Sequence, residues 1–334
     1  MGPARAGPLP TVAFLRLSTK SNSNDHLNPR VFAMALMPFL ESTPGFATPL
    51  QQLHDRLHSR APTGALGREW LDFVPVMDDG EIEHPSISCQ GVSVSYQGKR
   101  ALHPVHLEVA PNGVLALIGP SGSGKSTFLR CLNRMNDSLP GCQVKGKVML
   151  NGQDVYAPEI DTVSLRAQVS MIFQKPNPYP QTVYENVAYG LRIHGLATCP
   201  SHEHALVEEA LRQAGLWPEL RGQLKQAAHQ LSSGQQQRLC IARALAIKPS
   251  VILMDEPCSA LDPVSTAMIE GLIEELGESY PILLVTHSVQ QAARISQRTA
   301  FFDAGRLIEV GQTARMFTNP RQPLTETYIS GRMG

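Results

Sequence analysis

The stretch GPSGSGKST at residues 119–127 satisfies the phosphate-loop pattern G-x-x-x-x-G-K-[ST]. Its members are Gly119, Pro120, Ser121, Gly122, Ser123, Gly124, Lys125, Ser126 and Thr127. An apolar run at 114–118 precedes it and a helical pattern at 128–132 follows, which is the order of a buried strand, a loop and a helix. Glycines let successive backbone N–H groups turn toward one anion, and a helix N-terminus favours negative charge. The stretch therefore predicts a nucleoside triphosphate site.

Two side chains of this loop have distinct predicted roles toward ATP and Mg²⁺. We expect the Lys125 ammonium to contact the β- and γ-phosphates and the Ser126 hydroxyl to bind Mg²⁺. The alternative is a glycine-rich turn before an ordinary helix. The Lys-Ser ending and the apolar flanks favour the phosphate-binding interpretation.

Composition limits the class of protein. The chain has 334 residues, 42% of them hydrophobic, which indicates a globular protein with a full core. A formal net charge of zero gives no general reason to expect nucleic acid as a partner. Six cysteines without a C-x-x-C pair indicate a reducing compartment rather than a disulfide framework or a zinc site. No stretch approaches the roughly 20 apolar residues that cross a bilayer, so we expect a cytoplasmic location.

Residues 1–84 are predicted to form a disordered N-terminal extension. Short apolar pieces alternate there with polar and proline-rich ones, without a sustained period. The globular pattern begins at Pro85, shortly after Met77. The extension is either a partner-binding or targeting arm or a leader without function, and the absence of a packing pattern favours the leader.

Residues 85–334 are predicted to form an α/β domain. Strand patterns with buried or alternating apolar residues occupy 87–96, 103–109, 114–118, 147–150, 169–173, 282–285, 300–303 and 306–310. We expect the first two to pair in an antiparallel flank. Three prolines interrupt 175–180, and the helix-rich stretch that follows predicts a helical insertion at about 175–235.

A second helix N-terminus suited to an anion is predicted at residues 231–238. Its sequence is Leu-Ser-Ser-Gly-Gln-Gln-Gln-Arg, and the helix is expected to run to Ile247. Either Ser232 or Ser233 can cap the helix, because both carry the hydroxyl oxygen that an N-cap needs.

Two carboxylates and a histidine follow buried strands. Asp255 and Glu256 end the apolar run that begins at Val251, and His287 follows the run 282–285. Because the C-terminal ends of parallel strands face the ligand crevice, we expect Asp255 to bind Mg²⁺ through water and Glu256 to orient and polarise the attacking water. A surface turn is the alternative for the two acids. His287 is either a core or edge residue or a donor to the γ-phosphate.

The order of these motifs resembles the nucleotide-binding domain of ABC ATPases over residues 85–334. The segments that carry the resemblance are the phosphate loop, Gln174, 231–235, 251–256, 259–262 and His287. It implies a P-loop NTPase core of ABC type with an antiparallel β flank and a helical subdomain. It also implies that two copies close head to tail, with each ATP between one copy's phosphate loop and a turn of the other, formed by Ser232, Ser233, Gly234 and Gln235.

The resemblance assigns roles to three further residues. Gln174 would bind Mg²⁺, sense the γ-phosphate and relay its presence to the helical insertion. Asp262 would couple the two ATP sites. Tyr96 would stack on adenine, although packing in the core is the alternative for its ring.

Four segments resemble more specifically the ATP-binding subunit of bacterial phosphate importers, namely 132–137, 175–180, 184–190 and 328–334. This resemblance implies that hydrolysis drives two membrane permease subunits between access states, with the segment after Gln174 near the permease. It implies a peripheral position on the cytoplasmic face of the inner membrane. The permease and a periplasmic phosphate-binding protein would set the transported substrate.

Two positions depart from the family pattern. Ser233 occupies the first glycine of the usual L-S-G-G-Q motif and adds a side chain where the backbone approaches the partner's γ-phosphate. Cys258 stands where threonine is common. Another ABC importer, a soluble ABC ATPase without a permease, and a regulatory subunit that dimerises without turnover are the alternative functions.

Overall fold

The computed structural model describes Met77 and residues 82–332. These residues belong to the second of the two compact units into which the chain divides, 55–334. The predicted disordered extension lies outside the described residues, apart from Met77 and 82–84.

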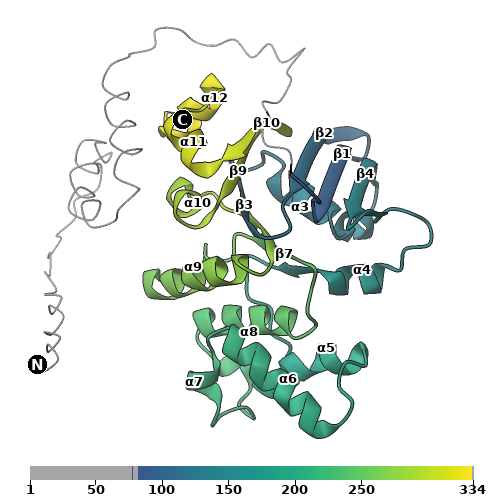
Figure 1. Ribbon diagram of the computed structural model, residues 1–334, viewed down its shortest axis with the longest axis vertical. Helices are drawn as coiled ribbons and strands as arrows, with labels where there is room; N and C mark the ends of the chain where they lie inside the picture. Colours follow the sequence, from purple (N-terminus) through teal and green to yellow (C-terminus); the bar gives the residue numbers. More distant parts are fainter. Residues whose placement is uncertain (1–76, 78–81, 333–334) are drawn as a thin grey trace, which may run out of the picture. The chain divides into compact units, whose positions relative to one another are not determined.

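A six-stranded sheet forms the centre of this unit, in the order β10-β9-β3-β8-β7-β6 (Figure 1). Its strands are β3 (Gly113–Ile118), β6 (Val169–Ile172), β7 (Val251–Asp255), β8 (Pro281–Val285), β9 (Arg298–Asp303) and β10 (Arg306–Gln312). Neighbouring strands pair in parallel except β9 and β10, which form an antiparallel hairpin. Every residue of β7 and β8 is buried, as expected for continuous apolar runs inside a parallel sheet.

A separate four-stranded antiparallel sheet confirms the predicted flank. Its order is β2-β1-β4-β5, made of β1 (Ile87–Tyr96), β2 (Lys99–Val109), β4 (Cys142–Leu150) and β5 (Gln153–Asp154). Strands β2 and β4 begin four and five residues before the predicted 103 and 147. Backbone pairing with β1 extends both strands to Lys99 and Cys142. The added residues mix exposed polar side chains with the buried Leu102 and the half-buried Cys142 and Val144.

Helices cover both faces of the central sheet. The helix α3 (Lys125–Cys131) shares a buried cluster with one face and with the antiparallel sheet, and 3₁₀-helix η1 (Met135–Ser138) and α4 (Thr162–Gln168) follow along the chain. The opposite face packs against α9 (Pro263–Gly277), α10 (Val289–Ile295), α11 (Thr313–Thr318) and α12 (Pro323–Ile329). The C-terminal ends of β3, β7 and β8 therefore meet beside the N-terminus of α3.

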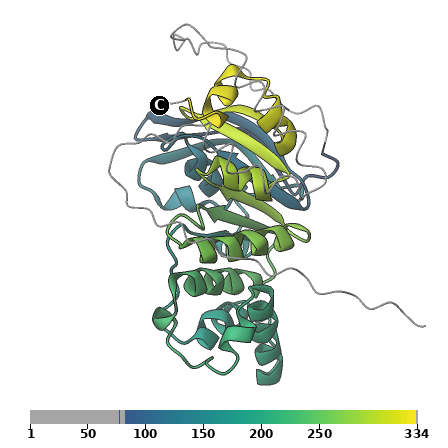
Figure 2. The ribbon, with the colours of Figure 1, turned by 90° about the vertical axis from the view of Figure 1, so that its left-hand side faces the viewer.

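The remaining helices form a body with its own buried cluster, at the lower end of the ribbon in Figures 1 and 2. They are α5 (Val183–Ile193), α6 (Pro200–Gln213), α7 (Trp217–Leu220), η2 (Ala228–Gln230) and α8 (Ser233–Leu245). Pro200 and Pro218 lie in the first turns of α6 and α7, where a missing N–H costs nothing. The exposed Cys199 is the N-cap residue of α6.

None of the helices in the described part of the chain has both the length and the hydrophobicity of a membrane span.

Candidate nucleotide site

The phosphate loop joins β3 to α3, and its glycines adopt backbone conformations that other residues avoid. Gly119 has a φ of 144° and Gly124 a φ of 100°. A Cβ added at Gly119 would overlap the carbonyl oxygen of Phe302 in β9. Glycine is thus required there both by the backbone angle and by the close approach of β9.

The Lys125 side chain is folded back into the loop. Its Nζ donates to the carbonyl oxygens of Gly119 and Pro120, at 2.7 and 2.9 Å, and to Ser123 Oγ at 3.3 Å. Burial lowers the pKa of Lys125, and the nearby carboxylates of Glu256 and Asp255 oppose that shift. The ammonium is consequently held at the centre of the loop by neutral oxygens, which a phosphate can replace.

Ser126 and Asp255 meet at the junction of α3 and β7. The Ser126 hydroxyl donates to Asp255 Oδ1 at 2.6 Å, and Arg130 lies 3.5 Å from Asp255 Oδ2. A hydroxyl and a carboxylate are hard oxygen donors, and Mg²⁺ commonly takes only one or two such protein ligands beside phosphates and water. The pair therefore fits a magnesium ion, even though the described residues contain no cluster of three or more His, Cys, Asp or Glu side chains that could hold a metal.

The Glu256 carboxylate contacts two other predicted site residues, Gln174 and His287. Its Oε2 accepts from Gln174 Nε2 at 3.3 Å and lies 3.2 Å from His287 Nδ1. The Glu256 backbone is left-handed, with φ of 50°, and its N–H donates to the carbonyl oxygen of Val285 at 2.9 Å. A left-handed conformation is costly for a residue with a Cβ and is often retained at functional sites. The residue thus turns sharply out of β7 and presents its carboxylate between β6 and β8.

Ser232, rather than Ser233, caps α8. Ser232 Oγ accepts from the N–H of Gln235 at 3.2 Å, while Gln235 Oε1 accepts from the N–H of Ser232 at 3.1 Å, which completes a capping box. Ser233 is the first helical residue, and helix α8 ends at Leu245, two residues before the predicted Ile247.

The first turn of α8 keeps donors available. Within the described part of the chain, no hydrogen bond uses the backbone N–H groups of Ser233 and Gly234 or the Ser233 hydroxyl. Figure 1 shows α8 and α3 on opposite sides of β7. The structure therefore does not bring this turn to the phosphate loop of the same copy.

Asp262 caps α9 next to the first turn of α8. Its carboxylate accepts from the Ser265 hydroxyl at 2.6 Å and from the N–H groups of Val264 and Ser265. These bonds, the one from the Ser265 hydroxyl first, lower the pKa of Asp262. A Cβ added at Gly234 would overlap the Ser265 side chain, so the two turns touch within one copy.

Tyr96 lies half-buried at the end of β1. Its hydroxyl donates to Asn136 Oδ1 at 3.2 Å, and burial raises the pKa of Tyr96. Asn136 is fully buried and donates from Nδ2 to the carbonyl oxygen of Thr127 at 2.9 Å. Sequence reasoning missed Asn136, although the stretch 132–137 was among the importer-like segments. Asn136 thereby connects Tyr96 to the helix that follows the phosphate loop.

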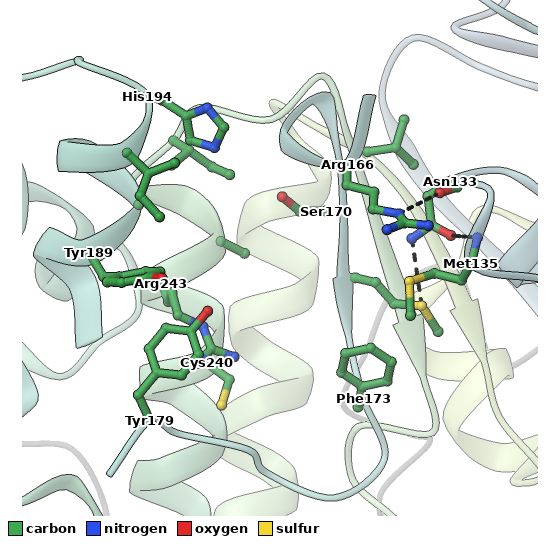
Figure 3. Close-up of a pocket in the computed structure, with 16 residues that line it drawn as sticks. Asn133, Met135, Arg166, Ser170, Phe173, Tyr179, Tyr189, His194, Cys240 and Arg243 are labelled. Carbon is green, nitrogen blue, oxygen red and sulfur yellow. Dashed lines mark hydrogen bonds between the residues drawn. The ribbon is translucent and has the colours of Figure 1, made fainter. Parts of the chain in front are cut away.

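A pocket of about 330 Å³ lies beside the segment that follows Gln174 (Figure 3). It is lined from α4, β6 and the segment after it, α5, α8 and the loop after α3. The lining residues include Asn133, Arg166, Phe173, Tyr179, Tyr189, His194, Cys240 and Arg243. Arg243 donates to the backbone and side-chain oxygens of Asn177 at 3.1 and 2.9 Å, and its guanidinium lies 4.5 Å from the centre of the Tyr179 ring. Sequence reasoning identified the importer-like segments 175–180 and 184–190 but missed Arg243, which approaches them from a distant helix.

The phosphate loop, the Ser126–Asp255 pair and Glu256 at the end of a buried parallel strand define a P-loop nucleoside triphosphatase. The particular class follows from the sequence match of residues 102–259 to the family described as ABC transporter. The chain therefore contains an ABC transporter ATP-binding domain, and hydrolysis of ATP is the activity of such a domain.

Solved structures support the fold assignment. The chain is similar to cbiO1 from Clostridium perfringens, which is part of the ABC transporter complex cbiONQ, with a TM-score of 0.63 and 22% identity over 74% of this chain and 100% of that one. It is also similar to a bacterial Atm1-family ABC exporter with ATP bound, with a TM-score of 0.61 and 26% identity. That match covers 79% of this chain but only 44% of the exporter.

Proposed function

We propose that this protein is the ATP-hydrolysing subunit of an ABC importer for inorganic phosphate. Two copies work head to tail beneath two permease subunits, at the cytoplasmic face of the bacterial inner membrane, and a periplasmic phosphate-binding protein delivers the substrate. The importer-like segments 132–137, 175–180, 184–190 and 328–334 support phosphate as the substrate. The regions that carry these proposals are the nucleotide site and the pocket beside α5.

Each residue of the nucleotide site has its own role in ATP hydrolysis. Lys125 binds the β- and γ-phosphates once they displace the loop carbonyls from its ammonium. Ser126 and Asp255 hold Mg²⁺, which supplies neutralising charge for the phosphate oxygens when it is bound. Glu256 accepts a hydrogen bond, and then a proton, from the attacking water. Gln174 and His287 hold the Glu256 carboxylate and are near enough to it to reach the same γ-phosphate.

The second copy completes each site. The unused N–H groups of Ser233 and Gly234 lie at the N-terminus of a 13-residue helix, where anions are favoured. Capping by Ser232 fixes this turn without using those two N–H groups. Both features support a turn that binds the γ-phosphate held by the other copy's phosphate loop. Tyr96 would contribute its ring to the adenine of the ATP bound to its own copy.

The pocket beside α5 is the single observation that supports the proposed coupling to a membrane partner. Tyr179 and Tyr189 pack edge to face at 5.0 Å, and Arg243 stacks on Tyr179. Tyr189 and the neighbouring Ile193 are nevertheless exposed, at 44% and 56%. Exposed aromatic and aliphatic side chains around a fixed cation suit a short helical segment of a permease, because aromatic residues and arginine are enriched at the centres of protein interfaces.

Transport of phosphate is tested in cells from which the coding region has been deleted. Restoring the unmodified gene should restore uptake of radiolabelled phosphate, whereas a gene encoding Glu256→Gln should not. Copurification of two membrane subunits with the tagged protein should accompany the recovery. Unchanged phosphate uptake in the deleted strain would contradict phosphate as the substrate, and labelled phosphate lost from preloaded cells only when the gene is present would indicate an exporter.

A further inference from the structure

The first turn of α8 is held from the side by α7. Glu219 accepts at Oε2 from Gln235 Nε2 at 2.8 Å and at Oε1 from Arg238 Nη1 at 2.7 Å. Arg238 makes a second bond to Glu219 Oε2, at 3.2 Å, and one to the carbonyl oxygen of Gly215 at 2.9 Å. One carboxylate thus joins two side chains at the start of α8 to α7, and Arg238 also contacts the connection between α6 and α7.

This arrangement fixes the Gln235 amide completely. Its oxygen accepts from the N–H of Ser232 inside the capping box, and its nitrogen donates to Glu219. Rotation of the amide would break both bonds. Because Gln235 follows Ser233 and Gly234 directly, its position also sets the direction of their unused N–H groups.

The ion pair of Glu219 with Arg238 is partly shielded from water. The Arg238 side chain is only 9% exposed, and the bonds from Arg238 lower the pKa of Glu219. A charge-assisted, bidentate pair of this kind holds its geometry more tightly than an exposed one. The ion pair of Glu208 with Arg212 in the same helical body offers a comparison, since it is more exposed and does not contact the turn.

We infer that Glu219 is a positioning residue for ATP hydrolysis and acts on the ATP bound by the opposite copy. The inference rests on the head-to-tail pairing in the proposed function. Glu219 touches no phosphate itself; it aims the Ser233–Gly234 donors through Gln235 and Arg238. Its loss should therefore reduce turnover and leave ATP binding to the phosphate loop of its own copy unchanged.

Steady-state kinetics of the full chain test this inference. Glu219→Gln keeps the side-chain volume but loses the charge-assisted bonds, and should lower kcat by about 10- to 100-fold, the usual effect of misplacing a group by about an ångström. The KM for ATP should stay within about twofold. Glu208→Gln is the matched control and should leave kcat and KM unchanged. Equal losses of kcat and melting temperature in both variants would overturn a positioning role.

Mixed pairs separate action on the opposite copy from damage to the same copy. Copies with two different affinity tags are coexpressed and purified as pairs in two arrangements. Each composite site combines the phosphate loop of one copy with the Ser233–Gly234 turn of the other. In the first arrangement, Glu219→Gln and Lys125→Ala lie on different copies, which leaves one composite site intact. In the second, both substitutions lie on one copy, and each composite site then carries one defect.

The first arrangement should hydrolyse ATP faster than the second. The opposite order would show that Glu219 acts only within its own copy. Equal rates that match the sum of the separate chains would show that no pairing takes place, and either result overturns the inference. Phosphate uptake by the unmodified protein is measured separately, so a failure of the transport proposal would be distinguished from a failure here.

Discussion

Glu256 combines a strained backbone with a carboxylate that two other segments hold in place. Its left-handed φ lies at the end of a fully buried strand, and Gln174 and His287 contact the carboxylate from neighbouring strands. Glu256 and His287 were site candidates because each follows a buried strand, whereas the role of Gln174 came from the resemblance to ABC ATPases. The conformation of Glu256 was not predictable, since nothing in a Leu-Met-Asp-Glu-Pro sequence marks a positive φ.

Replacing Glu256 by glutamine removes the proposed proton acceptor and keeps the size of the side chain. We expect Glu256→Gln to bind ATP normally and to lower kcat by about 100-fold or more, the usual range for loss of a general base. ATP should then hold two copies together, because the step that separates them is blocked. Turnover measured beside ATP-dependent size-exclusion chromatography checks both expectations. Turnover like that of the unmodified chain would remove Glu256 from the mechanism.

Ser233 places a hydroxyl where the turn approaches phosphate. The hydroxyl has no hydrogen bond among the described residues, and Ser232 already supplies the cap, so glycine at this position loses no intramolecular bond. If the side chain obstructs closure, Ser233→Gly should raise kcat by about threefold without changing the affinity of a single copy for ATP.

The assembled transporter is the right system for measuring Ser233→Gly, because closure of the pair is the step in question. Ser233→Ala, which keeps Cβ and removes the hydroxyl, is the matched control and should resemble the unmodified protein. A fall in kcat with glycine and alanine alike would instead mean that the hydroxyl binds the phosphate.

Helix α8 connects its first turn, proposed to bind the γ-phosphate, to the segment that contains Gln174. The fully buried Gln237 donates from Nε2 to the carbonyl oxygen of Phe173 at 3.0 Å, while its own Oε1 is buried without a hydrogen-bond partner. An unpaired buried oxygen costs about 1–3 kcal/mol of stability. Gln237 thus accepts an unpaired oxygen while it holds Phe173, the residue before Gln174. Its hydrogen bond to Phe173 is well placed to transmit movement between Gln174 and α8.

A near-isosteric apolar substitution separates this role from stability. Gln237→Met removes the unpaired oxygen together with the bond to Phe173, and these effects oppose each other. The free energy of unfolding should therefore change by no more than about 1 kcal/mol, while kcat falls. Denaturant unfolding and ATPase rates of the same preparation give the two quantities. A variant that keeps full kcat would show that the bond to Phe173 transmits nothing.

Periodicity and motif order were sufficient to predict the architecture of the molecule. Short apolar runs predicted the parallel strands, and alternation of apolar and polar residues in β1 predicted the antiparallel flank. Contacts between segments far apart in sequence were not predictable in this way. Glu219 and Arg238 lie in separate helices, and neither position has a local pattern that points to the other. Asn136 was not predicted for the same reason, because its role depends on a hydrogen bond from Tyr96, 40 residues earlier in the chain.

The molecule should not need its first 76 residues for folding or hydrolysis. The four buried clusters of the described residues run from Ile87 to Ile329, and Arg321 Nη1 donates to the carbonyl oxygen of Met77 at 2.9 Å. A chain that starts at Met77 keeps all of these contacts. It should match the full chain in melting temperature and ATPase rate, measured by calorimetry and phosphate release. A melting temperature lower by several degrees would mean that the extension packs against the core.

The exposed Cys199 gives the helical body a natural attachment point for a fluorescent dye. Bonds from the backbone N–H of His202 and from the Ser201 hydroxyl lower the pKa of its thiol, so the reactive thiolate forms at milder pH than in an ordinary cysteine. Of the other five cysteines, four are buried and Cys142 is half-buried, with burial raising the pKa of each. A maleimide dye at Cys199 would thus report, without any engineered residue, how α6 moves through each cycle of ATP hydrolysis.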